Sequence, residues 1–137
     1  MSDINVLGCI VASVVTFVSG FSWFNQKTFF PVWWRLLNKG SAQPGDGQNM
    51  ATVFAAQTLA IVVQVVALEL VLDKIGGEAG LDAVQGAFWG FVLGLGAAFS
   101  SLGHRLFGGF GFRVWLVEVG NDILNWAVIG LLLSALS

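Results

Sequence analysis

Charged residues are scarce in this sequence of 137 residues. Asp, Glu, Lys and Arg make up only 10% of it, whereas typical soluble domains contain about 25%. Hydrophobic residues make up 56%, and a soluble chain this short could not bury so many of them, because small domains leave much of their surface exposed. The composition therefore favours a protein embedded in a lipid bilayer.

Basic residues and cysteine are also rare. Six Lys and Arg residues and a formal net charge of −2 exclude a basic track along a nucleic-acid backbone. The single cysteine, Cys9, cannot form an internal disulfide or a thiolate metal cluster. We expect it to be a small packing residue within the first apolar segment.

Catalytic signatures are missing as well. The sequence contains no G-x-S-x-G, H-E-x-x-H, P-loop or dinucleotide-binding motif. We therefore expect no enzyme activity, no cofactor and no metal. His104 is the only histidine, and we interpret it as a residue at the membrane edge, with ligation of a haem or pigment as the alternative.

Four long apolar segments are present instead, at about residues 4–23, 50–72, 83–102 and 114–136. Each has roughly the 20 residues that a helix needs to cross about 30 Å of hydrocarbon. Four strands could not close a membrane barrel, so strands are disfavoured. The sequence predicts an all-α fold: residues 1–137 form one polytopic transmembrane bundle of four helices, with a short interfacial helix after the first.

The segment between the first two spans supplies that interfacial helix. Pro31 suits its first turn and Gly40 suits its end. The aromatic and basic residues near the span ends are expected to anchor the chain in the headgroup region. These anchors are Trp23, Trp33, Trp34, Arg35, Lys39, Arg105 and Arg113.

Basic residues also predict the orientation. The first and third loops contain Lys27, Arg35, Lys39, Arg105 and Arg113, whereas the second loop and the termini contain Lys74 alone. We therefore expect the first and third loops on the positive-inside face and both termini on the opposite face. The sequence leaves open whether the membrane is a bacterial inner membrane or that of an organelle.

Small residues recur every four positions in two of the spans, in the pattern of a glycine zipper. Such stripes let membrane helices approach closely, so we expect them to mark helix-packing faces within the protein or against a second copy. The stripes consist of Gly8, Ala12, Thr16 and Gly20 in the first span and of Gly86, Gly90, Gly94 and Ala98 in the third.

The fourth span carries an intramembrane polar stripe: Glu118, Asn121, Asp122 and Asn125. Their offsets of three, four and seven residues place them on one helix face. Acids rarely face hydrocarbon, so the stripe must face protein or water. We interpret it as a buried cluster that fixes helix register, with Arg105 or Arg35 as the partner of Glu118. The alternative is a proton or ion relay, or a polar binding pocket.

The second span adds three polar residues. Gln57 and Gln64 are seven residues apart and share a helix face. We expect them to hydrogen-bond to a neighbouring helix. Glu69 lies near the far end of the span, where we expect it to reach water on the side opposite Glu118.

Two groups of motifs stand out, one at the end of the first span and one in the second half of the chain. The first helix ends in Gly20-Phe-Ser-Trp23-Phe24, and Phe29 and Trp33 follow. The second half contains Gly90 and Gly94, then Leu106-Phe107-Gly108, then Glu118-Val-Gly120 and Gly130. These motifs resemble those of the small membrane-protein family catalogued as domain of unknown function 1761. Two positions depart from the family pattern: Asn25-Gln26 replaces its usual Ser-Pro, and Asn121 its frequent Tyr. The resemblance implies four membrane helices and no assigned activity.

Two functions are compatible with these features. The first is a non-catalytic structural or accessory subunit, which forms a homo-oligomer or joins a larger membrane complex through the small-residue stripes. The second is a small oligomeric transporter or channel, coupled to protons or cations through Glu118 and Asp122. A lipid-binding or pigment-binding accessory protein is a third possibility.

Overall fold

The computed structural model describes residues 4–137, which fold into helices without any strand. The long helices are α1 (Val6–Trp23), α3 (Met50–Gly76), α4 (Ala83–Phe107) and α5 (Phe112–Ala135). The short helix α2 (Phe30–Leu36) follows α1, and a single turn, η1 (Gly77–Ala79), extends α3. Four helices are long and apolar enough to cross a membrane. The predicted all-α fold with four long apolar helices is therefore confirmed.

Helix boundaries differ from those expected because hydropathy locates the end of the apolar segment and not the end of the helix. α3 continues past residue 72 to Gly76, and α4 continues past residue 102 to Phe107. α3 ends where Gly77 adopts a φ of 57°, which suits glycine. α4 begins with a capping box in which the side chains of Asp82 and Gln85 bond each other's backbone N–H.

The short helix α2 begins as predicted but ends early. Pro31 occupies its first turn, yet the helix stops at Leu36 rather than near Gly40. Asn38 is the reason, because it adopts a left-handed φ of 59° that breaks the helix before Gly40.

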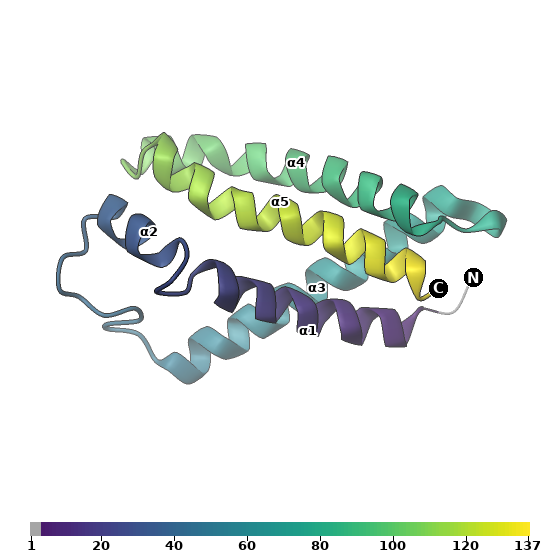
Figure 1. Cartoon of the computed structure of the whole chain (residues 1–137), viewed down its shortest axis with the longest axis horizontal. Coiled ribbons are helices and arrows are strands. Elements are labelled where there is room, and N and C mark those ends of the chain that lie inside the picture. Colours follow the sequence, from purple (N-terminus) through teal and green to yellow (C-terminus); the bar gives the residue numbers. More distant parts are fainter. Residues whose placement is uncertain (1–3) are drawn as a thin grey trace.

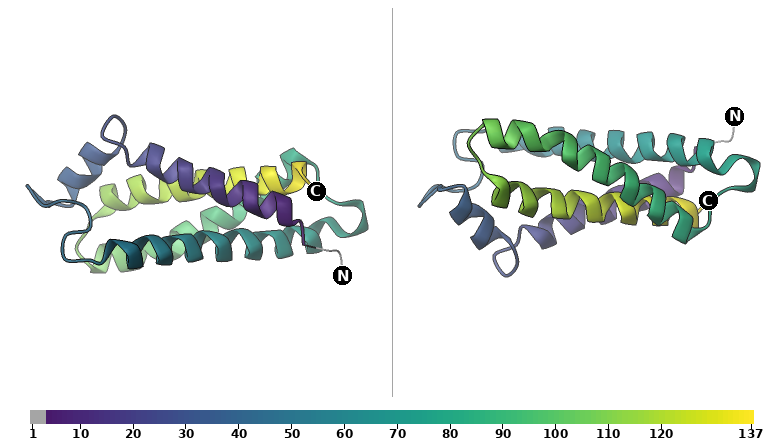
Figure 2. Two further views of the ribbon diagram at one scale, coloured as in Figure 1. Left: turned by 90° about the horizontal axis from the view of Figure 1, so that it is seen from below. Right: turned by 90° about the horizontal axis from the view of Figure 1, so that it is seen from above.

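The helices form an elongated bundle in which α4 and α5 lie side by side and antiparallel (Figure 1). α1 packs on α5, and α3 packs on α1 and α5. The loops 24–49 and 108–111 lie at one end of the bundle, which we call the α2 end (Figure 1). The turn 77–82, the start of α1 and the C-terminus lie at the other end, the terminal end (Figures 1 and 2).

The small residues of α4 create its close contact with α5. Gly86, Gly90, Gly94 and Ala98 are all buried. A methyl group added at Gly90 would collide with the carbonyl oxygen of Trp126, and one at Gly86 with Gly130 and Ser134. The stripe of α4 therefore meets α5 rather than the stripe of α1.

The stripe of α1 is less uniform. Gly8, Ala12 and Thr16 are buried, and Ala12 belongs to the main hydrophobic core. A methyl group added at Gly20 would meet nothing within 4 Å. The α1 stripe is therefore packed near the terminal end and open near the α2 end.

The main core fills the middle and the terminal half of the bundle. Its buried residues are Ala12, Ile61, Val65, Leu68, Leu72, Ile129 and Leu133. Towards the α2 end, α1 and α3 diverge (Figure 2, left). Residues 51–60 of α3 are all exposed there, so this half of α3 contributes little to the core.

Candidate ligand-binding groove

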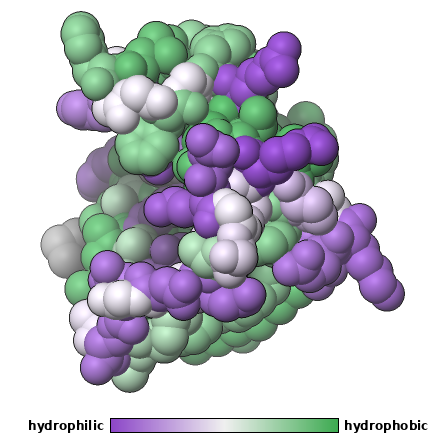
Figure 3. Space-filling model, turned by 90° about the vertical axis from the view of Figure 1, so that its left-hand side faces the viewer, coloured by the Kyte–Doolittle hydropathy of each residue, from purple (hydrophilic) through white to green (hydrophobic). Residues whose placement is uncertain are grey.

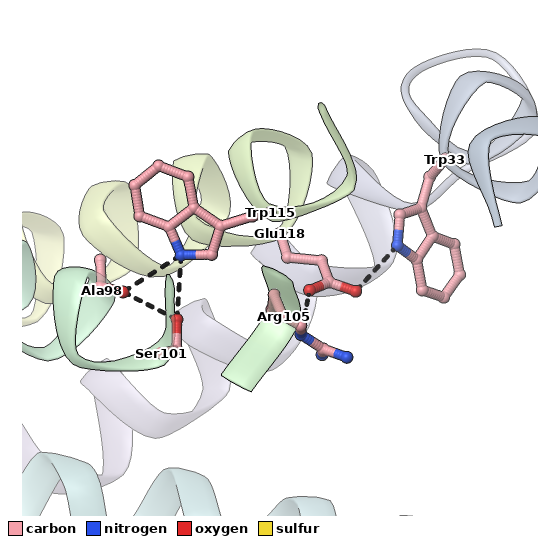
Figure 4. A network of polar contacts seen from close by, with 6 residues as sticks. All are labelled: Trp33, Ala98, Ser101, Arg105, Trp115 and Glu118. Carbon is pink, nitrogen blue, oxygen red and sulfur yellow. Dashed lines mark hydrogen bonds and ion pairs between the residues drawn. The ribbon is translucent and has the colours of Figure 1, made fainter. Parts of the chain in front are cut away.

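The polar stripe of α5 begins with a residue that is fully engaged inside the protein. One oxygen of Glu118 lies 2.8 Å from Nε of Arg105 on α4. The other accepts a 3.1 Å hydrogen bond from the indole N–H of Trp33 on α2. Figure 4 shows the carboxylate held between these two groups. Arg105, one of the two predicted partners, thus neutralises Glu118, and the bonds join α2, α4 and α5.

Tryptophans expected at the membrane interface also donate hydrogen bonds within the protein. Trp23 donates to the carbonyl of Val117 at 2.9 Å, and Trp34 donates to that of Ala42 at 3.1 Å. The Trp23 ring also stacks on Phe29 with a centroid distance of 4.2 Å. Arg35, Lys39 and Arg113 remain exposed at the α2 end, where hydrophilic side chains gather (Figure 3).

Trp115 is a structural residue that the sequence analysis missed. It is 3% exposed, and its indole N–H lies 3.0 Å from Oγ of Ser101 and 3.2 Å from the carbonyl oxygen of Ala98 (Figure 4). It precedes Glu118 by three residues, so the helical spacing of the stripe could have included it. Trp115 and Glu118 together fasten the start of α5 to α4.

The rest of the stripe faces a groove between α1, α3 and α5. Asn121, Asp122 and Asn125 all line it. Asn121 accepts a 3.2 Å hydrogen bond from the hydroxyl of Ser19. Among the residues described, Asp122 and Asn125 form no side-chain hydrogen bond, and no basic side chain lies within 4 Å of the Asp122 carboxylate.

The groove has a volume of about 530 Å³, which lies within the range of small-molecule sites. Thr16 of α1 and Gln57 and Gln64 of α3 add polar groups to its walls. The predicted hydrogen bonds from these two glutamines to a neighbouring helix are absent in residues 4–137. Their amides face the groove instead, because α3 diverges from α1 at this point.

Buried polar side chains are concentrated in this groove. The buried ones in the described chain are Thr16, Asn121 and Asn125, and all three line it. Glu69, at the terminal end, is partly buried and accepts a 3.1 Å hydrogen bond from the backbone N–H of Asn5. The groove is therefore the polar part of an otherwise apolar interior.

The residues described do not group into a metal site. No three His, Cys, Asp or Glu side chains in residues 4–137 lie close enough to hold a metal ion. His104 is exposed in the last turn of α4. The candidate site is consequently a groove with hydrogen-bonding groups and one carboxylate.

A comparison with known families gives one match. The family model described as "Protein of unknown function (DUF1761)" matches residues 7–134. Because the match covers nearly the whole chain, the protein belongs to this family, as its motifs suggested. No curated protein matches it, and no solved structure does.

Proposed function

We propose that this member of the family is a small membrane carrier that binds its solute in the groove between α1, α3 and α5. The observation that carries the proposal is the polar lining of that groove. Asp122, Asn125, Gln57 and Gln64 line it without side-chain hydrogen bonds to other described residues. Polar groups at membrane depth are costly unless they have a partner, and a bound solute would supply one.

The shape of the groove supports a carrier more than a channel. The groove occupies the half of the bundle nearer the α2 end, whereas the core from Ala12 to Leu133 fills the other half with apolar side chains. A polar cavity closed on one side by an apolar core is the arrangement expected of a carrier in one of its two states. In this proposal Asp122, rather than Glu118, contacts the solute, because Glu118 is already paired.

A groove-filling substitution tests the proposal. Gln57→Trp would place a large ring in the groove, whereas Leu59→Trp would place it on the outer face of the same helix, since Leu59 is 65% exposed. The purified proteins would be screened for thermal stabilisation by neutral, anionic, zwitterionic and cationic small molecules. We expect at least one class to stabilise the unmodified protein and Leu59→Trp but not Gln57→Trp. Equal stabilisation of all three proteins, or of none, would contradict it.

A specific observation also supports the second candidate, an accessory subunit. Residues 51–60 of α3 are exposed on every side of the helix, including the groove side at Gln57. A helix from a second copy or from another protein could pack there and cover the amides. Light scattering in mild detergent would measure the mass of the complex. A stable, folded monomer would argue against the subunit, and a defined oligomer that Gln57→Trp dissociates would support it.

A further inference from the structure

Asp122 is the only charged side chain among the described residues that line the groove, and none of those residues is a Lys, Arg or His. Arg105 lies outside this lining. Its Nε is 2.8 Å from a carboxylate oxygen of Glu118, and its guanidinium carbon is 5.1 Å from the ring centre of Phe110. The charge of the groove is therefore complementary to a cation and repels an anion.

The position of Asp122 far along α5 makes a bound cation more favourable than it would be near the start of the helix. Asp122 lies ten residues after Phe112, the first residue of α5, which corresponds to about 15 Å along the axis. An unpaired carboxylate at this depth is unfavourable, and a positive group beside it offsets much of the cost. Glu118, one turn earlier on α5, forms an ion pair with Arg105, whereas Asp122 forms no ion pair or side-chain hydrogen bond with any described residue.

Aromatic rings form much of the remaining wall. They belong to Phe17, Phe21, Phe24, Phe30, Trp33 and Phe54. Aromatic faces attract organic cations and bury apolar groups. This lining suits a ligand with a positive centre and an aromatic or aliphatic body.

An inorganic cation fits the groove less well. Divalent ions take about six or more oxygen ligands at short distances, and one carboxylate with scattered amides does not provide such a cage. A bare ion would also leave most of the 530 Å³ empty. The volume and the aromatic walls point to an organic ion of drug-like size.

We propose that the groove binds amphipathic organic cations, with the positive centre near Asp122 and the apolar body against the aromatic wall. This rests on the proposed function, since it names the solute class for the same groove. The amides of Gln57, Gln64 and Asn125 then hydrogen-bond to polar substituents of the ligand or to water that accompanies it.

Two ions of nearly the same shape and opposite charge test this inference. Tetraphenylphosphonium and tetraphenylborate would be dialysed against the full chain in nanodiscs of phosphatidylcholine, with empty nanodiscs to measure partition into lipid. We expect the protein to retain the cation and not the anion. Asp122→Asn should weaken cation binding about 10- to 100-fold, because it removes the Coulomb attraction between two opposite charges in a partly desolvated groove. Glu78→Gln, which changes the net charge equally at an exposed position of the terminal end, should leave it unchanged.

The alternative results separate this inference from the proposed function. If both ions bind equally and Asp122→Asn has no effect, the cation preference is wrong, and the stabilisation screen with Gln57→Trp decides whether the groove binds a solute. If neither ion binds above the level of empty nanodiscs, the cation class is wrong, and the stabilisation screen with Gln57→Trp decides the carrier proposal on its own. The preference of the unmodified protein for one ion over the other tests the inference even if Asp122→Asn does not fold.

Discussion

The α4–α5 contact and the groove between α1, α3 and α5 are built on opposite principles. Gly86, Gly90 and Gly94 bring the backbones of α4 and α5 together until no methyl group could be added, and Trp115 and Glu118 form hydrogen bonds or ion pairs across the contact. In the groove, α3 diverges, and the side-chain amides of Gln57 and Gln64 form no hydrogen bond with residues 4–137. Both regions share α5, so one side of this helix packs closely against α4 and another side lines a groove that is open to a ligand.

This comparison predicts that substitution of Gly90 causes the largest loss of folding stability. Gly90→Leu would push a side chain into the backbone carbonyl of Trp126 and should destabilise the protein by about 3 kcal/mol, at the upper end of the usual cost of overpacking. Gly96→Leu is the matched control, because it lies on the same helix and a methyl group there meets nothing within 4 Å. Thermal unfolding in detergent would compare the two. Equal losses of stability would show that the α4–α5 contact is not close.

The ion pair at the start of α5 should give the next largest effect. Glu118→Gln removes the charge that Arg105 faces, and the two side chains are 15% and 38% exposed. Breaking a fully buried ion pair would reduce the free energy of unfolding further, so for this partly exposed pair we expect a reduction of about 1 to 2 kcal/mol. Arg105→Met combined with Glu118→Gln should restore part of that loss, because no unpaired charge remains. Strictly additive losses in the double variant would argue against the pair.

Much of this arrangement could be predicted from local spacing. The offsets of three, four and seven residues placed Glu118, Asn121, Asp122 and Asn125 on one face of α5, and charge alone made Arg105 a candidate partner of Glu118. The four-residue repeat of α4 indicated a packing face in the same way. Such patterns can be recognised in the sequence because helical periodicity depends only on neighbours in the sequence.

It could not be predicted in this way that Glu118 would form an ion pair while Asp122 would line a groove. Whether Asp122 faces a partner or a groove depends on the angle at which α3 leaves α1, which is set by contacts such as those of Ile61 and Val65 in the core. Trp33 was expected to contact lipid headgroups, and its bond to Glu118 depends on how α2 folds back onto α5. Both features arise from contacts between distant segments.

The hydrogen bonds of Trp115 should give a smaller effect. Trp115→Phe keeps an aromatic ring but removes the N–H that faces Ser101 and the carbonyl of Ala98, so the loss should exceed that of a control by about 1 kcal/mol. Trp89→Phe is a suitable control, because Trp89 packs on the main core and forms no side-chain hydrogen bond in the described chain. Unfolding midpoints of the two variants would be compared. Equal shifts would mean that the bonds of Trp115 contribute little.

The smallest effect on stability should come from Asp122, four residues after Glu118 on the same helix. Asp122→Asn removes a charge without breaking a side-chain hydrogen bond or ion pair to any described residue, so the free energy of unfolding should change by less than about 0.5 kcal/mol or increase slightly. Unfolding under the conditions used for Glu118→Gln would give the comparison directly. A loss as large as that of Glu118→Gln would mean that Asp122 also supports the fold. A negligible loss would support the proposed role of Asp122 in ligand binding rather than in the fold, since a carboxylate without an ion pair in an apolar bundle does not stabilise it.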